Sequence, residues 1–313
     1  NMSITQKVNP DHDRIYLGSA KTNVQDSTFS FVLEISEPQV GILYNSELFI
    51  TPGDSVYLEI NGSDVLKAVG TNSKNYDIMR LIRNSDWPNT RTQHFAFQEY
   101  SQKVKAICDR LQLDIANYGL TEEAKLYFRE KIKFKYYSNL LSFYRHQIYT
   151  GKQELTAADE KTVPLDSILK PTSPVVPFEF LPYINDYFNL KDLGLNTEKE
   201  LKDYIKKLDE SFTHPEAREI TLAIFYKNQF EKHKQNFTYR PVLEEVYTSF
   251  LKPQLTDSVA IALAVDSYNL FSSYSNKLPD YILSQKLINM AGDTVRFADV
   301  IDQYKNYKKG IYL

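Results

Sequence analysis

Cysteine is nearly absent from this chain of 313 residues, which contains Cys108 alone. A single thiol excludes an internal disulfide framework and every zinc finger built on cysteine pairs. The five histidines include no pair at the three- or four-residue spacing of metal ligands on a helix. They are His12, His94, His146, His214 and His233. We therefore expect no metal site.

An excess of positive charge and long apolar runs are also missing. Lysine and arginine number 37 against 40 aspartates and glutamates, a net charge of -3, which argues against a nucleic-acid partner. No run approaches the roughly 18 apolar residues of a membrane-spanning helix. The segment from Asn1 to Pro10 has neither a signal-peptide core nor a lipidation cysteine. We expect any export signal or lipid anchor to have been on an N-terminal segment already removed.

The common catalytic motifs are absent as well. The chain has no Gly-x-Ser-x-Gly elbow, no phosphate-binding glycine loop and no dinucleotide fingerprint. Adjacent carboxylates such as Glu122-Glu123 lie about 100° apart on a helix and do not flank one bond. A basic run between Lys125 and Lys135 is interpreted as the solvated face of a helix, and Cys108 as a core residue. We expect no catalytic residue and no cofactor-binding residue.

The length and composition of the chain predict a globular protein of about two domains. Hydrophobic residues make up 42% of the chain, with 23 tyrosines and 18 phenylalanines. As far as Gly70, short segments rich in β-branched and aromatic residues alternate with turn residues, which indicates strands. Thr51-Pro52-Gly53-Asp54 is a tight turn among them. The expected strands are Asp13 to Ala20, Thr28 to Ser36, Gln39 to Asn45, Glu47 to Thr51 and Ser55 to Asn61.

After Gly70, apolar residues recur at helical spacing. Two apolar stripes predict long helices that form an antiparallel hairpin through Asn117-Tyr118-Gly119. The first stripe is Phe97, Tyr100, Val104, Ile107, Cys108 and Leu111, and the second is Phe128, Ile132, Tyr136, Leu140 and Phe143. Five prolines between Thr150 and Pro182 predict a crossing loop.

Two capping boxes, Thr197 with Glu200 and Thr213 with Glu216, begin later helices. Further helices are expected at about Pro241 to Leu251 and Asp257 to Tyr274, without the fixed period of a helical solenoid. From Lys286 the chain predicts a strand, a turn at Ala291-Gly292-Asp293, a second strand to Phe297 and a short helix from Ala298 to Lys305. Tyr307 to Leu313 reads as a last apolar strand.

This final segment resembles the opening of TlpA-like and ResA-like thiol-disulfide oxidoreductases, in which a two-stranded turn and a short helix precede a strand after a Lys-Gly pair, here Lys309-Gly310. The first 70 residues resemble the N-terminal accessory domain of such exported proteins. The matching motifs there are Phe29-Ser30-Phe31 and Phe49-Ile50-Thr51-Pro52-Gly53-Asp54. The resemblance implies a Cys-x-x-Cys soon after Leu313, so this chain supplies no redox-active residue.

We therefore expect an α+β, multidomain protein. Residues 1–70 form a small antiparallel β-sandwich domain that packs on an α-helical domain of residues 71–284, and residues 285–313 begin a truncated thioredoxin-like domain. The expected function is that of a non-catalytic accessory or interaction region of a periplasmic or cell-envelope oxidoreductase, with a protein as partner or substrate. The alternative is a stand-alone binding protein for a peptide or carbohydrate, which an aromatic groove at Trp87 would favour.

Overall fold

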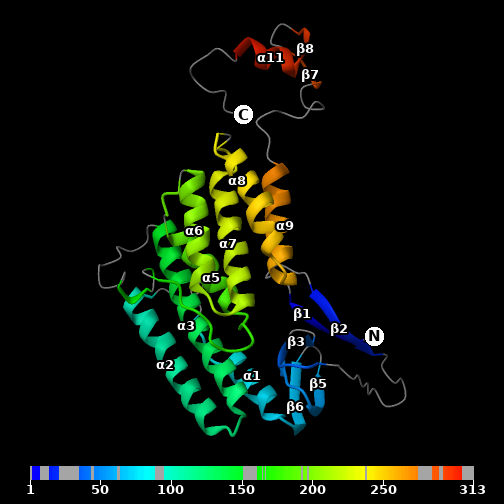
Figure 1. Ribbon diagram of the computed structural model, residues 1–313, viewed down its shortest axis with the longest axis vertical. Helices are drawn as coiled ribbons and strands as arrows, with labels where there is room; N and C mark the ends of the chain where they lie inside the picture. The colour runs from blue at the N-terminus through cyan, green and yellow to red at the C-terminus, as the bar shows by residue number, and fades with distance from the viewer. Residues whose placement is uncertain are drawn as a thin grey trace.

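The fold combines helices with small antiparallel sheets (Figure 1). The computed structural model describes residues 2–7, 14–20, 35–43, 46–61, 64–88, 95–150, 161–163, 165, 167–191, 193–195, 197–236, 238–273, 284–288 and 292–304. Most of the strand expected at Thr28 to Ser36 lies outside these residues, as do His12, His94 and the last strand expected at Tyr307 to Leu313.

The N-terminal strands form two antiparallel sheets. A four-stranded sheet has the order β2-β1-β3-β4, from β1 (Met2–Lys7), β2 (Arg14–Ala20), β3 (Gln39–Leu43) and β4 (Ser46–Ile50). A separate hairpin joins β5 (Ser55–Asn61) to β6 (Asp64–Thr71). Strand β1 was not expected, because the polar Met2–Lys7 segment gains its strand structure from pairing with β2 and β3 rather than from its own side chains.

Two glycines permit the close turns of this region. Gly53 has a φ of 82° after Pro52, and the amide of Asp54 donates to the carbonyl of Thr51 at 3.1 Å, so the expected tight turn is confirmed. Gly70 has a φ of 130°, and a Cβ there would lie 2.1 Å from the carbonyl oxygen of Ser55. Any other residue at position 70 would force β5 and β6 apart.

The β region packs on the helices, as expected. Phe49 of β4 is fully buried, and its ring stacks on Tyr127 at a centroid distance of 4.5 Å and meets Phe128 edge-on at 5.7 Å. Leu43, Leu48 and other residues form a second, smaller cluster with β5 and β6. The core of the β region is therefore partly made by α3.

Helices α2 (Phe97–Asn117) and α3 (Glu122–Thr150) form the expected hairpin. The turn between them uses Gly119, which has a φ of 68°. The stripe on α2 is buried apart from the half-buried Ile107. Helix α1 (Lys74–Arg83), which follows β6 directly, was not expected, because only ten residues separate two turn segments.

The remaining helices extend this hairpin into a bundle. Helix α5 (Phe180–Leu190) follows the proline-rich crossing segment and packs on α3 and α7. The bundle continues through α6 (Glu198–Ser211), α7 (Pro215–His233), α8 (Arg240–Val246), a π-helical turn at Tyr247–Leu251, a 3₁₀ turn at Lys252–Gln254, and α9 (Ser258–Ser273).

One expected helix cap is confirmed and the other is wrong. Thr197 and Glu200 form a reciprocal capping box at the start of α6. At α7 the N-cap is His214 rather than Thr213, and the Nδ1 atom of His214 accepts from the amide of Ala217 at 3.5 Å. Pro215 fixes the first helical position, so the helix begins one residue later than the Thr-x-x-Glu pattern suggests.

The C-terminal elements are a hairpin of β7 (Lys286–Ile288) and β8 (Thr294–Arg296), followed by α11 (Phe297–Tyr304). Their order agrees with the sequence prediction. The hairpin is not docked on the helical region: Figure 1 shows it beyond α9 and apart from the bundle, and all three residues of β7 are exposed. Strands of three residues carry too little apolar surface to hold the hairpin against the bundle.

Candidate functional site

A buried lysine joins three elements where the sheet meets the bundle. Lys131 of α3 has a side chain only 4% exposed, and its ammonium lies 2.5 Å from Glu47 Oε2 on β4. The same ammonium donates to both carboxylate oxygens of Glu179, the residue before α5, at 2.7 Å. The sequence prediction of a solvated basic face is therefore wrong for Lys131, because the sheet and the loop before α5 cover this part of α3.

The charges of Lys131, Glu47 and Glu179 determine which of these groups carries a proton. Burial lowers the pKa of Lys131, but attraction to Glu179 and Glu47 outweighs burial, and the pKa of Lys131 is raised overall. Burial raises the pKa of Glu179, and the lysine offsets part of that rise. One ammonium faces two carboxylates, so Lys131 keeps its proton and is a structural cation rather than a nucleophile.

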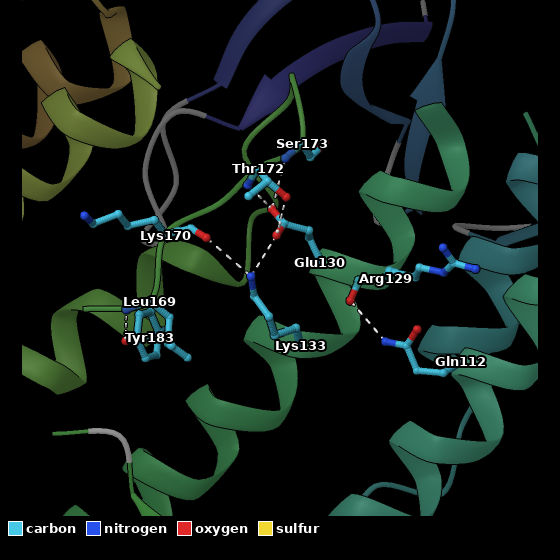
Figure 2. Close-up of polar contacts among 9 residues, drawn as sticks. All are labelled: Gln112, Arg129, Glu130, Lys133, Leu169, Lys170, Thr172, Ser173 and Tyr183. Carbon is cyan, nitrogen blue, oxygen red and sulfur yellow. Dashed lines mark hydrogen bonds and ion pairs between the residues drawn. The ribbon is translucent and has the colours of Figure 1, made fainter. Parts of the chain in front are cut away.

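The loop that carries Glu179 is held by the neighbouring residue on α3, Glu130. The buried Glu130 carboxylate accepts from the amide of Thr172 at 2.7 Å, the amide of Ser173 at 3.1 Å and the Thr172 hydroxyl at 3.1 Å (Figure 2). Lys133 donates to the same carboxylate at 2.7 Å and to the carbonyl of Lys170 at 3.3 Å. Adjacent residues of α3 therefore fix the crossing segment and the triad.

A cavity of about 290 Å³ opens above the triad. Its lining combines apolar residues with cationic side chains of α1 and α3. The cavity is lined by Glu47, Leu48, Tyr76, Met79, Arg80, Ile82, Arg83, Trp87, Lys131, Lys135, Phe178 and Glu179. This combination of apolar surface and a few convergent polar groups is typical of a small-molecule site.

Trp87 is held at this cavity by one hydrogen bond. Its indole N–H donates to the carbonyl of Ile82 at 3.0 Å, and the ammonium of Lys135 lies 5.8 Å from the centre of its ring. Lys135 follows Lys131 by one helical turn, so both lysines are on the same side of α3. Trp87 therefore lines this cavity together with Tyr76.

A second cavity, of about 340 Å³, lies beside the first and also includes Glu47 in its lining. Its titratable residues are acidic: Glu37, Glu216 and Asp257. Burial raises the pKa of Glu216 to about 7, with further contributions from Asp257 and Glu37, while the amide of Val176 opposes the rise. The two cavities therefore present opposite charge.

Cys108 is confirmed as a core residue. It is 7% exposed on the buried side of α2, and burial, followed by the charge of Asp109, raises its pKa to about 12. A thiol with so high a pKa is protonated at neutral pH and is a poor nucleophile.

The other candidate residues that the structure describes lie apart from the triad. In the described part of the chain, no three His, Cys, Asp or Glu side chains are grouped to hold a metal ion. Glu122 and Glu123 are exposed in the first turn of α3, where the helix dipole favours them, and Glu122 pairs with Lys125 at 2.7 Å. None of the described helices has the length and apolar character required to cross a membrane.

Sequence reasoning did not find the triad. The adjacent Glu130 and Lys131 lie between the core residues Phe128 and Phe134 and were an available signal, because charges on the covered side of a helix require partners. Comparison with known protein families, curated proteins and solved structures gave no match to this chain.

Proposed function

We propose that this chain is the non-catalytic accessory region of an extracytoplasmic thioredoxin-like thiol-disulfide oxidoreductase, and that it positions the catalytic domain and engages a partner protein. The observation that carries the proposal is the group of β7, β8 and α11, which lies apart from the bundle (Figure 1). Its order of strand, turn, strand and short helix is the order that the resemblance implies for the opening of the catalytic domain.

The exposure of this group supports its assignment to a larger fold. Ile288 is 77% exposed and Leu287 is 39% exposed. Two short strands and one short helix bury too little surface to be stable by themselves. In the proposed protein, further strands and helices of the catalytic domain cover these apolar side chains.

The buried thiol and the triad support the accessory role. Disulfide exchange requires a thiolate that attacks one sulfur and a second thiol that resolves the mixed disulfide, and Cys108 meets neither requirement. The ion pairs of Lys131 with Glu47 and Glu179 connect the β region to the bundle. Such a connection suits an accessory region that holds the catalytic domain and its partner protein at a fixed distance.

Reduction of a model disulfide by glutathione, with this chain and with the full-length gene product, tests the proposal. We expect the uncatalysed rate with this chain and a catalysed rate with the full-length product, lost when its Cys-x-x-Cys cysteines become serine. A full-length product without that motif would overturn the proposal, as would catalysis by this chain that Cys108→Ser removes.

A stand-alone binding protein for a peptide or carbohydrate is the second candidate. The cavity lined by Trp87 is the observation that favours it. Saturable binding of such a ligand by a full-length product that lacks a Cys-x-x-Cys motif would support this candidate over the first.

A further inference from the structure

We propose that the cavity formed by α1, α3 and β4 binds a small organic carboxylate with an apolar body. The proposal goes beyond the accessory function and does not rest on it, because it requires neither a thiol nor a further domain. It assigns a ligand class to the cavity above the Lys131 triad.

The size of the cavity selects a small molecule. A volume of about 290 Å³ is near the lower limit of known ligand pockets, roughly 300 to 1,000 Å³. Such a space holds a molecule of amino-acid size rather than a folded segment of a partner protein. Its apolar lining includes Leu48, Tyr76, Met79, Ile82 and Phe178.

The charge of the lining selects an anion. The carboxylates of Glu47 and Glu179 are both bonded to Lys131, at 2.5 and 2.7 Å. Arg80, Arg83 and Lys135 line the same cavity, so its lining holds four cations against two carboxylates, and Arg80 also pairs with Asp77 at 3.4 Å. An excess of cations in a lining that is otherwise largely apolar focuses a field that attracts a carboxylate, in a protein whose overall charge is -3.

Lys135 is the residue to which we assign the carboxylate contact. Among the described residues it makes no ion pair within 4 Å, and its ammonium faces the Trp87 ring at 5.8 Å. An anion bound there gains a charge-assisted hydrogen bond from Lys135 and the field of Arg83. The apolar body of the ligand then lies against Trp87 and Ile82.

Trp87 provides the readout, because it is the single tryptophan of the chain. Three probes share one apolar body and differ in charge: 3-phenylpropionate, 3-phenylpropanamide and 3-phenylpropylammonium. Titration of the whole chain is followed by tryptophan emission and by calorimetry. We expect saturable binding of the carboxylate, at least about tenfold weaker binding of the neutral amide, and no binding of the ammonium.

Two variants localise the contact. We expect Lys135→Gln to weaken binding of 3-phenylpropionate about tenfold, while Lys125→Gln, which removes the same charge elsewhere on α3, leaves it unchanged. If circular dichroism shows that Lys135→Gln does not fold, the exposed Arg83→Gln replaces it, with a severalfold loss expected.

Three results would overturn the inference. These are the absence of binding of all three probes, equal binding of the three, and a preference for the ammonium. Unchanged affinity in a folded Lys135→Gln variant would overturn the assignment of the carboxylate contact. None of these results bears on disulfide exchange, so failure here and failure of the proposed function are separable.

Discussion

Glu130 of α3 and Glu219 of α7 make the same set of hydrogen bonds. Each carboxylate accepts from the hydroxyl and amide of a threonine and from the amide of the next residue, Thr172-Ser173 for Glu130 and Thr256-Asp257 for Glu219. In both cases the bonded loop leads into the next helix of the bundle, α5 or α9. A buried glutamate therefore holds the loop before α5 and the loop before α9 by the same contacts.

The sequence around the two glutamates is also alike. Each glutamate follows an arginine and precedes, at the same spacing, two aromatic residues and an asparagine. The matching residues are Arg129, Tyr136, Tyr137 and Asn139 on α3, and Arg218, Phe225, Tyr226 and Asn228 on α7. A search for a fixed period misses this similarity, because the connecting segments differ in length.

Loss of either carboxylate charge should destabilise the protein to a similar extent. We expect Glu130→Gln and Glu219→Gln each to lower the free energy of unfolding by about 2 to 3 kcal/mol, because both carboxylates are buried and accept backbone amides. Urea denaturation measures the change, with the exposed Glu123→Gln as the control. A neutral effect of one substitution would show that the two contacts are not equivalent.

Substitution of the triad lysine alone should destabilise the protein more than substitution of all three triad residues. We expect Lys131→Met to lower stability by about 3 to 5 kcal/mol, because it leaves the buried carboxylate of Glu179 and the half-buried carboxylate of Glu47 without their shared cation. Adding Glu47→Gln and Glu179→Gln to it should restore part of the loss. Lys125→Met is the matched control on the same helix, and equal unfolding midpoints for Lys131→Met and Lys125→Met would contradict the structural role of Lys131.

Much of the helical fold could be predicted from sequence, because apolar residues at helical spacing mark α2 and α3 and five prolines mark the segment between α3 and α5. The partners of the charged residues could not be predicted from sequence. Lys131 and Lys133 both flank Ile132 on α3, yet one is covered by the sheet and the other reaches the crossing segment. Only the tertiary arrangement distinguishes them, since the pairing residue Glu47 is far away in the chain.

Stability should depend on pH through Glu216. Its pKa is raised from 4.5 to about 7 in the folded state, so the folded protein binds more protons than the unfolded chain between these values. The contribution of Glu216 to stability is therefore full below about pH 4.5 and is lost as the pH rises through about 7. We expect Glu216→Gln to be more stable than the wild type at pH 8 by roughly 1 to 3 kcal/mol.

Thermal denaturation of both proteins from pH 5 to 8 checks this dependence. Glu210→Gln, an exposed substitution on α6, is the control and should follow the wild type. The neighbouring acids Asp257 and Glu37 also face Glu216, so the difference between variant and wild type is the quantity to compare. A difference that does not change with pH would argue against the raised pKa.

Cys108 should react slowly in the folded protein. Burial on α2 hides the thiol, and its pKa of about 12 leaves almost no thiolate at neutral pH. We expect reaction with a chromogenic disulfide reagent to be at least about a hundredfold slower in buffer than in urea. Equal rates in the two conditions would refute the burial.

The β region should not be stable without the helices. Phe49 is buried against Tyr127 and Phe128, and Glu47 pairs with Lys131, all of which are lost when the chain is cut after Gly70. We expect residues 1–70 to show no cooperative thermal transition by circular dichroism. A fragment that melts cooperatively, at the temperature of the whole chain, would show that the β region is independent.

Hydrogen exchange at the β7–β8 hairpin tests the proposal that this hairpin opens a thioredoxin-like domain. The amides of Leu287 and Val295 are compared in this chain and in the full-length gene product, with the buried Val104 of α2 as the internal reference. We expect exchange close to the unprotected rate in this chain and strong protection in the full-length protein. Equal exchange in the two proteins would contradict it.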